Sequence, residues 1–121
     1  MDYLFVHGTL RRGGSNNGLL SDCAFLGPAE TAQQYALYLI NRKPMITKLP
    51  TSTIKGDVYS VTDEMLLLVD RFSGHPRVNR RELVAVQLED GKTVDAWLYF
   101  YIQPLHNPIL IESGEYTELK P

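Results

Sequence analysis

Short connections between successive strand-like segments limit the folds open to this chain more than any other property. Runs of aromatic and β-branched residues bounded by turn residues predict strands, and they occupy residues 3–6, 24–26, 35–40, 56–61, 81–88 and 93–102. Most of the intervening stretches are too short for a regular series of strand–helix–strand crossovers. The sequence therefore predicts an α+β fold dominated by strands, either a small barrel or a strongly curved sheet.

One helix is expected between the strands at 56–61 and 81–88. Thr62 can cap its first turn, in which acidic residues 63–64 complement the helix dipole. Apolar residues follow at the helical spacing i, i+3, i+4 and i+7, and these are Met65, Leu68, Val69 and Phe72.

Turn residues divide the rest of the chain. Residues 8–18 hold four glycines together with serine and asparagine, which predicts a loop, and residues 19–20 can close a short helical turn. Two prolines bracket a loop or edge strand at 44–50, and the Asp-Gly pair within 89–92 predicts a tight hairpin turn. The tail from 113 onward is expected to be partly loose.

Composition favours small-molecule partners. With 121 residues, 44% of them hydrophobic, the chain can bury one core but is too short for two ordinary domains, so we expect a single domain over 1–121. A net charge of −2 gives no general attraction for nucleic acid or an anionic membrane. The longest uncharged stretch, residues 96–111, is too short and polar for a membrane span.

A cytoplasmic location is expected by elimination. The start of the chain has no basic segment leading into an apolar stretch, as an export signal requires. The single cysteine, Cys23, can form no internal disulfide and suits a reducing compartment.

The loop after the first strand resembles a phosphate-binding loop but lacks its main cation. Residues 8–15 have the glycines that expose backbone N–H groups to an anion, yet Gly14 stands where that motif requires lysine. Nucleotide binding is therefore disfavoured. A backbone nest for a smaller anion, such as a carboxylate, remains open.

Metal and nucleophile motifs are not expected. The three histidines, His7, His75 and His106, have no helical i, i+4 pairing and no cluster of cysteine or carboxylate partners. Ser73 lies two residues before His75, but no nucleophile-elbow pattern surrounds it. A turn after the helix explains this segment better than a catalytic pair.

An ordered set of short blocks resembles the γ-glutamylcyclotransferase-like family, which includes the AIG2-like proteins. The blocks agree in order and spacing over nearly the whole chain, and they lie at 3–13, 25–27, 56–59, 69–76, 80–81, 96–99 and 113–116. The resemblance implies a small mixed β-barrel with short flanking helices, and a pocket whose rim includes the loop after the first strand.

The resemblance also implies a reaction and its substrate class. In the family, the α-amine of a γ-glutamyl amine or peptide attacks its own γ-carbonyl and releases 5-oxoproline and the free amine, without a cofactor. A loop of tyrosine, glycine, serine or threonine, and leucine holds the glutamyl end, and a glutamate after the helix moves the protons. The partner implied for this chain is a small γ-glutamyl compound or a similar carboxylate.

Three positions depart from the family pattern. The loop keeps Gly8, Thr9 and Leu10 but has His7 in place of tyrosine, and Ser73 occupies the position of the catalytic glutamate. Asn79 replaces a tyrosine commonly found there. The expected substrate-binding residues are thus His7, Gly8, Thr9, Leu10 and Asn79.

The loss of the glutamate leaves the activity open. A neutral serine hydroxyl is a poor proton acceptor near pH 7, and losing a positioned base reduces a rate by about 10²- to 10⁴-fold. His7, with an ordinary pKa near 6.5, is one candidate for a substitute base, and His75 is another. The alternatives are a diverged cyclotransferase, a non-catalytic small-ligand-binding module, and a scaffold for another protein.

Overall fold

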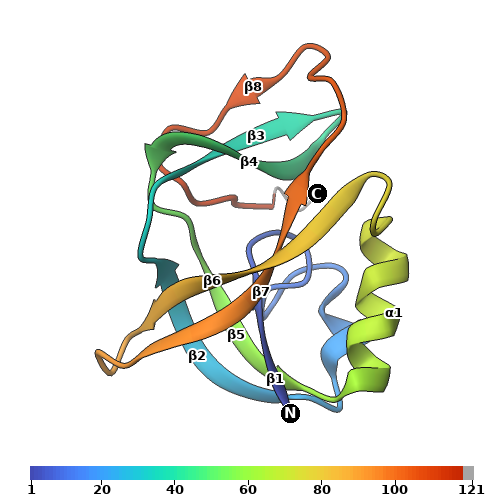
Figure 1. The fold of residues 1–121 in the computed structure, drawn as a ribbon, viewed down its shortest axis with the longest axis vertical. Helices are drawn as coiled ribbons and strands as arrows, with labels where there is room; N and C mark the ends of the chain where they lie inside the picture. The colour runs from blue at the N-terminus through green and yellow to red at the C-terminus, as the bar shows by residue number, and fades with distance from the viewer. Residues whose placement is uncertain (119–121) are drawn as a thin grey trace.

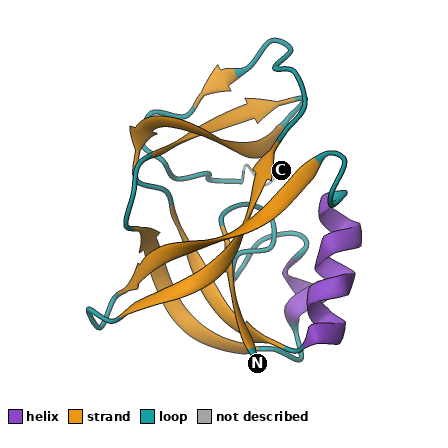
Figure 2. Cartoon of the chain, viewed as in Figure 1, coloured by secondary structure: helices purple, strands orange, loops and turns teal. Residues whose placement is uncertain are grey.

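The computed structural model describes residues 1–118, whose strands form a closed barrel and a separate three-stranded sheet. The strand order of the barrel is β1-β5-β2-β6-β7 (Figure 1). These strands are β1 (Asp2–Val6), β2 (Ala24–Thr31), β5 (Lys55–Val61), β6 (Asn79–Leu88) and β7 (Thr93–Tyr101). Figure 2 shows the α-helix beside the barrel among strands and loops. The predicted strand-dominated α+β fold is confirmed.

Strand β1 closes the barrel. It pairs antiparallel with β5 along its whole length, and it pairs parallel with β7 where Leu4 lies opposite Trp97. Because side chains alternate between the two faces of a strand, Phe5 joins a core shared with β3 and β4, whereas Leu4 and Val6 join a core beneath the helix. The mixed barrel is therefore built around the short apolar run at the start of the sequence.

The second sheet has the order β4-β3-β8 and consists of β3 (Tyr35–Ile40), β4 (Lys43–Ser52) and β8 (Ile109–Leu110). A two-residue turn joins β3 to β4, with φ of 49° at Asn41 and 65° at Arg42. Positive φ at both central residues is the signature of a type I′ hairpin turn. The stretch from 44 to 50, expected to be a loop or edge strand, is an edge strand.

Helix α1 (Asp63–Ser73) begins and ends as its sequence predicts. The Oγ1 atom of Thr62 accepts a hydrogen bond from the Met65 N–H at 3.1 Å, and Gly74, with φ of 71°, caps the other end. The buried residues of the helix differ from those predicted by the apolar spacing. They are Leu66, Val69 and Asp70. Leu68 and Phe72 remain 44% and 49% exposed.

The part of the tail that the structure describes is held in place after β8. The N–H of Lys55 donates to the Gly114 carbonyl at 2.9 Å, and Tyr116 packs against the core shared with β3 and β4. Residues 119–121 of the expected loose tail lie outside the described residues.

Two short local predictions are confirmed. A 3₁₀ helix, η1 (Asn17–Leu20), follows the glycine-rich loop, and Gly91, with φ of 89°, forms the turn between β6 and β7. Within the described part of the chain, no helix is both long and apolar enough to cross a membrane.

Candidate functional site

A cavity of about 540 Å³ lies where three segments that are distant in the sequence meet. These segments are the loop after β1, the turn between β3 and β4, and the C-terminal end of α1. The ends of α1 and β3 lie on the same side of the barrel in Figure 1. Among the residues that line the cavity are His7, Gly8, Thr9, Leu10, Arg42, Lys43, Pro44, Met45, Arg71, Phe72, Ser73, Val78, Asn79 and Tyr99.

The expected substrate-binding residues and Ser73 all line this one cavity. The loop contributes residues 7–10, the last turn of α1 contributes Ser73, and the first residue of β6 is Asn79. The three departures from the family pattern therefore lie around a common space. His75, the other candidate base, is absent from the described lining, and its Nδ1 atom accepts a hydrogen bond from the Arg81 N–H at 3.3 Å.

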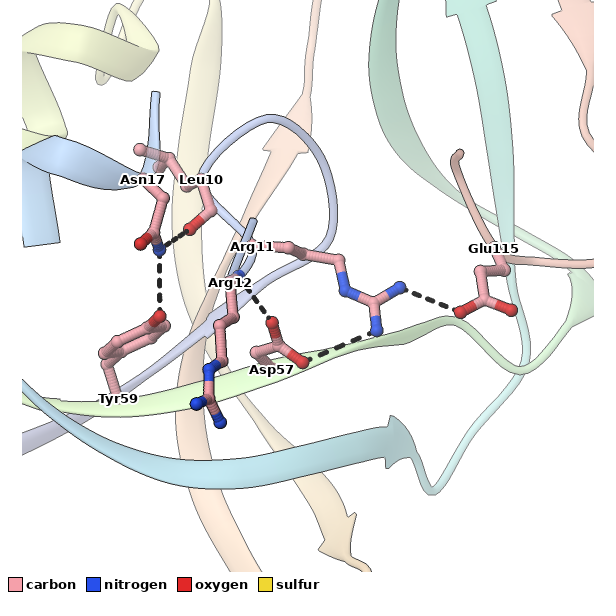
Figure 3. A network of polar contacts seen from close by, with 7 residues as sticks. All are labelled: Leu10, Arg11, Arg12, Asn17, Asp57, Tyr59 and Glu115. Atoms are coloured by element: carbon pink, nitrogen blue, oxygen red, sulfur yellow. Dashed lines mark hydrogen bonds and ion pairs between the residues drawn. The ribbon is translucent and has the colours of Figure 1, made fainter. Parts of the chain in front are cut away.

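The loop after β1 is fixed to the barrel by the polar network in Figure 3. The carboxylate of Asp57, on β5, accepts a hydrogen bond from the Arg12 N–H at 2.8 Å and one from the Arg11 guanidinium at 3.4 Å. Arg11 also donates to Glu115 at 2.9 Å. Asp57 is only 3% exposed, so its charge is compensated mainly by these donors. The network holds the loop from its barrel side.

A second anchor lies farther along the same loop. The amide of Asn17 donates to the Leu10 carbonyl and to the Tyr59 hydroxyl, both at 2.8 Å. These two bonds are also drawn in Figure 3. Leu10 is buried in the core beneath α1, so its position is set by packing as well as by hydrogen bonding.

The loop leaves backbone donors unused beside the cavity. The Arg11 N–H donates to the Gly8 carbonyl, and the Asn16 N–H donates to the Thr9 carbonyl, both at 3.0 Å. The N–H groups of Thr9 and Leu10 have no hydrogen-bond partner among residues 1–118. Successive free N–H groups are suited to a carboxylate. Both residues line the cavity.

Gly8 permits the close approach between this loop and the β3–β4 turn. A Cβ atom at Gly8 would lie 2.7 Å from Cγ of Pro44, which is too near for two carbon atoms. The loop after β1 and the start of β4, which both line the cavity, are thus close together at this point.

His7 is a neutral group at physiological pH. Burial, together with the positive charge of Arg11, lowers the pKa of its imidazole to about 4. Its Nδ1 atom is buried and has no hydrogen-bond partner within the described chain. His7 therefore places an uncharged, unpartnered polar atom at the cavity wall.

Asn79 connects the two walls of the site. Its side-chain amide donates to the backbone carbonyl of Ser73 at 2.7 Å, and the residue is 8% exposed. This bond joins the start of β6 to the end of α1 and satisfies a carbonyl that the helix end leaves free. Asn79 thus holds Ser73 in position as well as lining the cavity.

A polar cluster that the sequence did not reveal supports this end of α1. Oδ1 of Asp70 accepts hydrogen bonds from Arg81 Nε at 2.8 Å and from the Tyr99 hydroxyl at 2.6 Å. Burial alone would raise the pKa of Asp70, but these hydrogen bonds and nearby positive charge hold it below its ordinary value. The pKa of Tyr99 is raised by burial and by the Asp70 carboxylate, so its hydroxyl stays protonated and bonded to Asp70.

The charge of the cavity lining has one sign. Arg42, Lys43 and Arg71 line it, whereas no aspartate or glutamate does so among the described residues. No local pattern predicts this grouping, because the β3–β4 turn and the start of β4 are about thirty positions from the end of α1.

The arrangement of barrel, loop and helix end has counterparts among known proteins. A family model described as "Gamma-glutamyl cyclotransferase, AIG2-like" matches residues 4–118. The chain belongs to this family. The family assignment made from the ordered sequence blocks is thereby confirmed.

Individual members of the γ-glutamylcyclotransferase family match over most of their length. A Methanocaldococcus jannaschii protein assigned as a γ-glutamylcyclotransferase is 38% identical over 121 residues, covering 99% of each chain. The γ-glutamylaminecyclotransferase of Homo sapiens is 32% identical, over 79% of this chain and 69% of its own. The crystal structure of an AIG2-like protein from Mus musculus superposes with a TM-score of 0.81 at 26% identity, covering 97% of this chain and 88% of that one.

Proposed function

We propose that this family member binds a small γ-glutamyl compound, or a similar carboxylate, in the cavity, with cyclotransferase activity lost or strongly reduced. The observation that carries the proposal is the absence of any carboxylate from the described lining, which has Ser73 at the end of α1. Cyclisation requires a proton to leave the α-ammonium before its nitrogen can attack the γ-carbonyl. A serine hydroxyl does not supply that base at neutral pH.

The other features of the site favour binding. The unused N–H groups of Thr9 and Leu10 supply donors for a carboxylate. The fixed loop reduces the entropy lost when a ligand is held, because its conformation is already set by Asp57 and Asn17. Binding and orientation therefore depend on parts of the site that are separate from the missing base.

The test pairs calorimetry with a product assay. We expect γ-glutamyl compounds to bind the unaltered protein, which will release little or no 5-oxoproline. Ser73→Glu should raise 5-oxoproline release by about 10²- to 10⁴-fold, since it returns a carboxylate to the helix end. Ser73→Gln is the matched control because the glutamine side chain has the same length as that of glutamate but no charge.

The outcomes separate binding from catalysis. If none of the γ-glutamyl compounds binds detectably, the proposed ligand class is contradicted. Rapid turnover by the unaltered protein, with no gain in Ser73→Glu, would contradict the proposed loss of the base.

A second candidate function is supported by His7. Its Nδ1 atom is buried without a partner at the cavity wall, and the ring is neutral at pH 7, so a diverged cyclotransferase could use it to accept the proton. A pKa of about 4 makes this imidazole a weak base. If His7 is the base, His7→Gln will abolish 5-oxoproline release while ligand binding persists; equal release by the two proteins would exclude it.

A further inference from the structure

The outer side of α1 has large apolar side chains that the described chain leaves exposed. Leu67 is 60% exposed and Leu68 is 44% exposed, and Phe72 follows one turn later at 49%. A surface helix normally directs one apolar stripe to the core and polar residues to water. In α1 the core side is already formed by Leu66 and Val69. Figure 1 shows the helix at one margin of the molecule, so its second apolar side lies at the surface.

Two opposite charges flank these leucines on the same side of the helix. Glu64 lies in the first turn and Arg71 in the last turn, and residues 64, 67, 68 and 71 have the spacing i, i+3, i+4 and i+7 that shares one face. Both charged residues are exposed, and neither forms an ion pair with a residue of the described chain. Seven residues separate them by about 10 Å along the axis, so they are too far apart to pair with each other.

The helix dipole alone does not explain this pattern. It favours an acid at the start of a helix and a base at its end, but it does not require them to share a face with two exposed leucines. Contiguous exposed apolar side chains with polar residues at their rim are typical of an interaction surface. The outer side of α1 therefore has the composition of an interface.

The order of acid, two leucines and base is complementary to itself when it is reversed. A two-fold axis that passes between Leu67 and Leu68 would set two copies of the helix antiparallel. Glu64 of each copy would then lie opposite Arg71 of the other, and Leu67 opposite Leu68. A self-complementary patch of this kind is what an isologous homodimer interface requires. Antiparallel packing also places the opposite ends of the two helix dipoles side by side.

We propose that the outer side of α1 is the interface of a symmetric, antiparallel dimer of this chain. The residues that form it are Glu64, Leu67, Leu68, Arg71 and Phe72. Because each copy contributes mainly one helix, the buried area falls at the small end of the range for specific complexes, below about 1,200 Å². The dimer is accordingly weak and forms as the protein concentration rises. Arg71 and Phe72 also line the cavity, so the second copy lies beside its rim.

Sedimentation equilibrium at about 10 μM to 1 mM protein measures such an association. The average mass of the unaltered protein should rise from that of one chain toward that of two. Leu67→Gln and Leu68→Gln should each weaken association by at least about tenfold, because one substitution alters a symmetric dimer at two places. Leu49→Gln, on β4, is the matched control, since Leu49 is 59% exposed, and it should have no effect. Circular dichroism checks that each variant is folded.

Charge reversal tests the antiparallel arrangement. Glu64→Arg and Arg71→Glu should each weaken self-association by about tenfold, because each puts like charges opposite one another at both ends of the interface. The variant with both reversals should recover the association of the unaltered protein. An equimolar mixture of the two single variants should associate more tightly than either variant alone, since every facing pair in the mixed dimer has opposite charges. These differences should shrink in high salt, whereas the effect of the leucine substitutions should persist.

Each result supports or overturns the interface. A protein that stays monomeric over the whole concentration range would overturn it and leave this side of α1 to a partner of another kind. A dimer that neither leucine substitution weakens would also overturn it, because another surface would then hold the copies together. If the double reversal and the mixture both fail to regain association, the antiparallel pairing is wrong and the proposal fails with it.

Discussion

The half-buried histidine at the cavity wall makes folding stability depend on pH in a calculable way. An unfolded chain protonates His7 near its ordinary pKa of 6.5, whereas the folded chain does so only near 4. Because the unfolded state takes up the proton first, the contribution of His7 to stability is lost as pH falls below about 6.5. One unit of pKa shift corresponds to about 1.4 kcal/mol, so the loss reaches about 3 kcal/mol by pH 4.

The assay compares the protein with His7→Gln, which does not titrate in this range. Urea unfolding followed by circular dichroism at several values between pH 7.5 and 4 gives the free energy of unfolding of each protein. Other acidic groups affect both proteins equally, so the difference between them isolates His7. We expect the stability of the unaltered protein relative to His7→Gln to decrease by about 3 kcal/mol across the window.

The reasoning would be refuted if the free energies of unfolding of the two proteins changed with pH in parallel, to within about 0.5 kcal/mol. That result would mean that the imidazole is hydrated in the folded protein or that another group supplies a partner when it is protonated. It would also restore His7 to a pKa suited to general-base chemistry near neutral pH.

Three further predictions concern the wall of the cavity and the Asp70 cluster that supports the end of α1. Gly8→Ala brings Cβ to 2.7 Å from Cγ of Pro44. It should lower the free energy of unfolding by about 1–3 kcal/mol and weaken ligand binding. An unchanged denaturation midpoint would contradict the close contact. Arg42→Gly should leave the free energy of unfolding unchanged or raise it by up to about 1 kcal/mol, because relief of the left-handed strain offsets or exceeds the added freedom of the unfolded chain. Urea titration measures this free energy. Asp70→Asn should reduce the free energy of unfolding by about 2–3 kcal/mol, somewhat below a fully buried pair because Arg81 is partly exposed; a loss under 0.5 kcal/mol in the same titration would show that the cluster is not stabilising.

Most strands follow from local patterns, and the differences have physical causes. The strand expected at 24–26 extends to Thr31 because a register shift at Gly27, with φ of 130°, carries pairing with β5 past the Gly-Pro pair. From the local sequence alone, a Gly-Pro pair predicts the end of a strand. Strand β8 has only two residues and exists through its pairing with β3, which no local signal announces.

The cavity also contains residues that local sequence patterns predict and residues that they do not. Residues 7–10 and Ser73 were predicted to share a pocket because the family pattern places them on segments with clear local signals, a strand end and a helix end, and they line one cavity. The cations of the β3–β4 turn and the Asp70 cluster were not found, because they meet other parts of the site only through tertiary packing. Phe72 shows the limit of periodicity, since its apolar spacing predicts a core position but it lies half exposed at the cavity.

The ion pair between Arg11 and Glu115 has a consequence for the order of folding. It joins residues 104 positions apart, and closing so long a loop is entropically costly until the intervening chain is compact. We therefore expect the barrel to form before the loop after β1 is fixed, which gives Arg11 and Glu115 small φ-values in folding kinetics. Glu115→Gln should accelerate unfolding and leave the folding rate nearly unchanged. The capacity to bind would then be the last property that this chain acquires and the first that it loses.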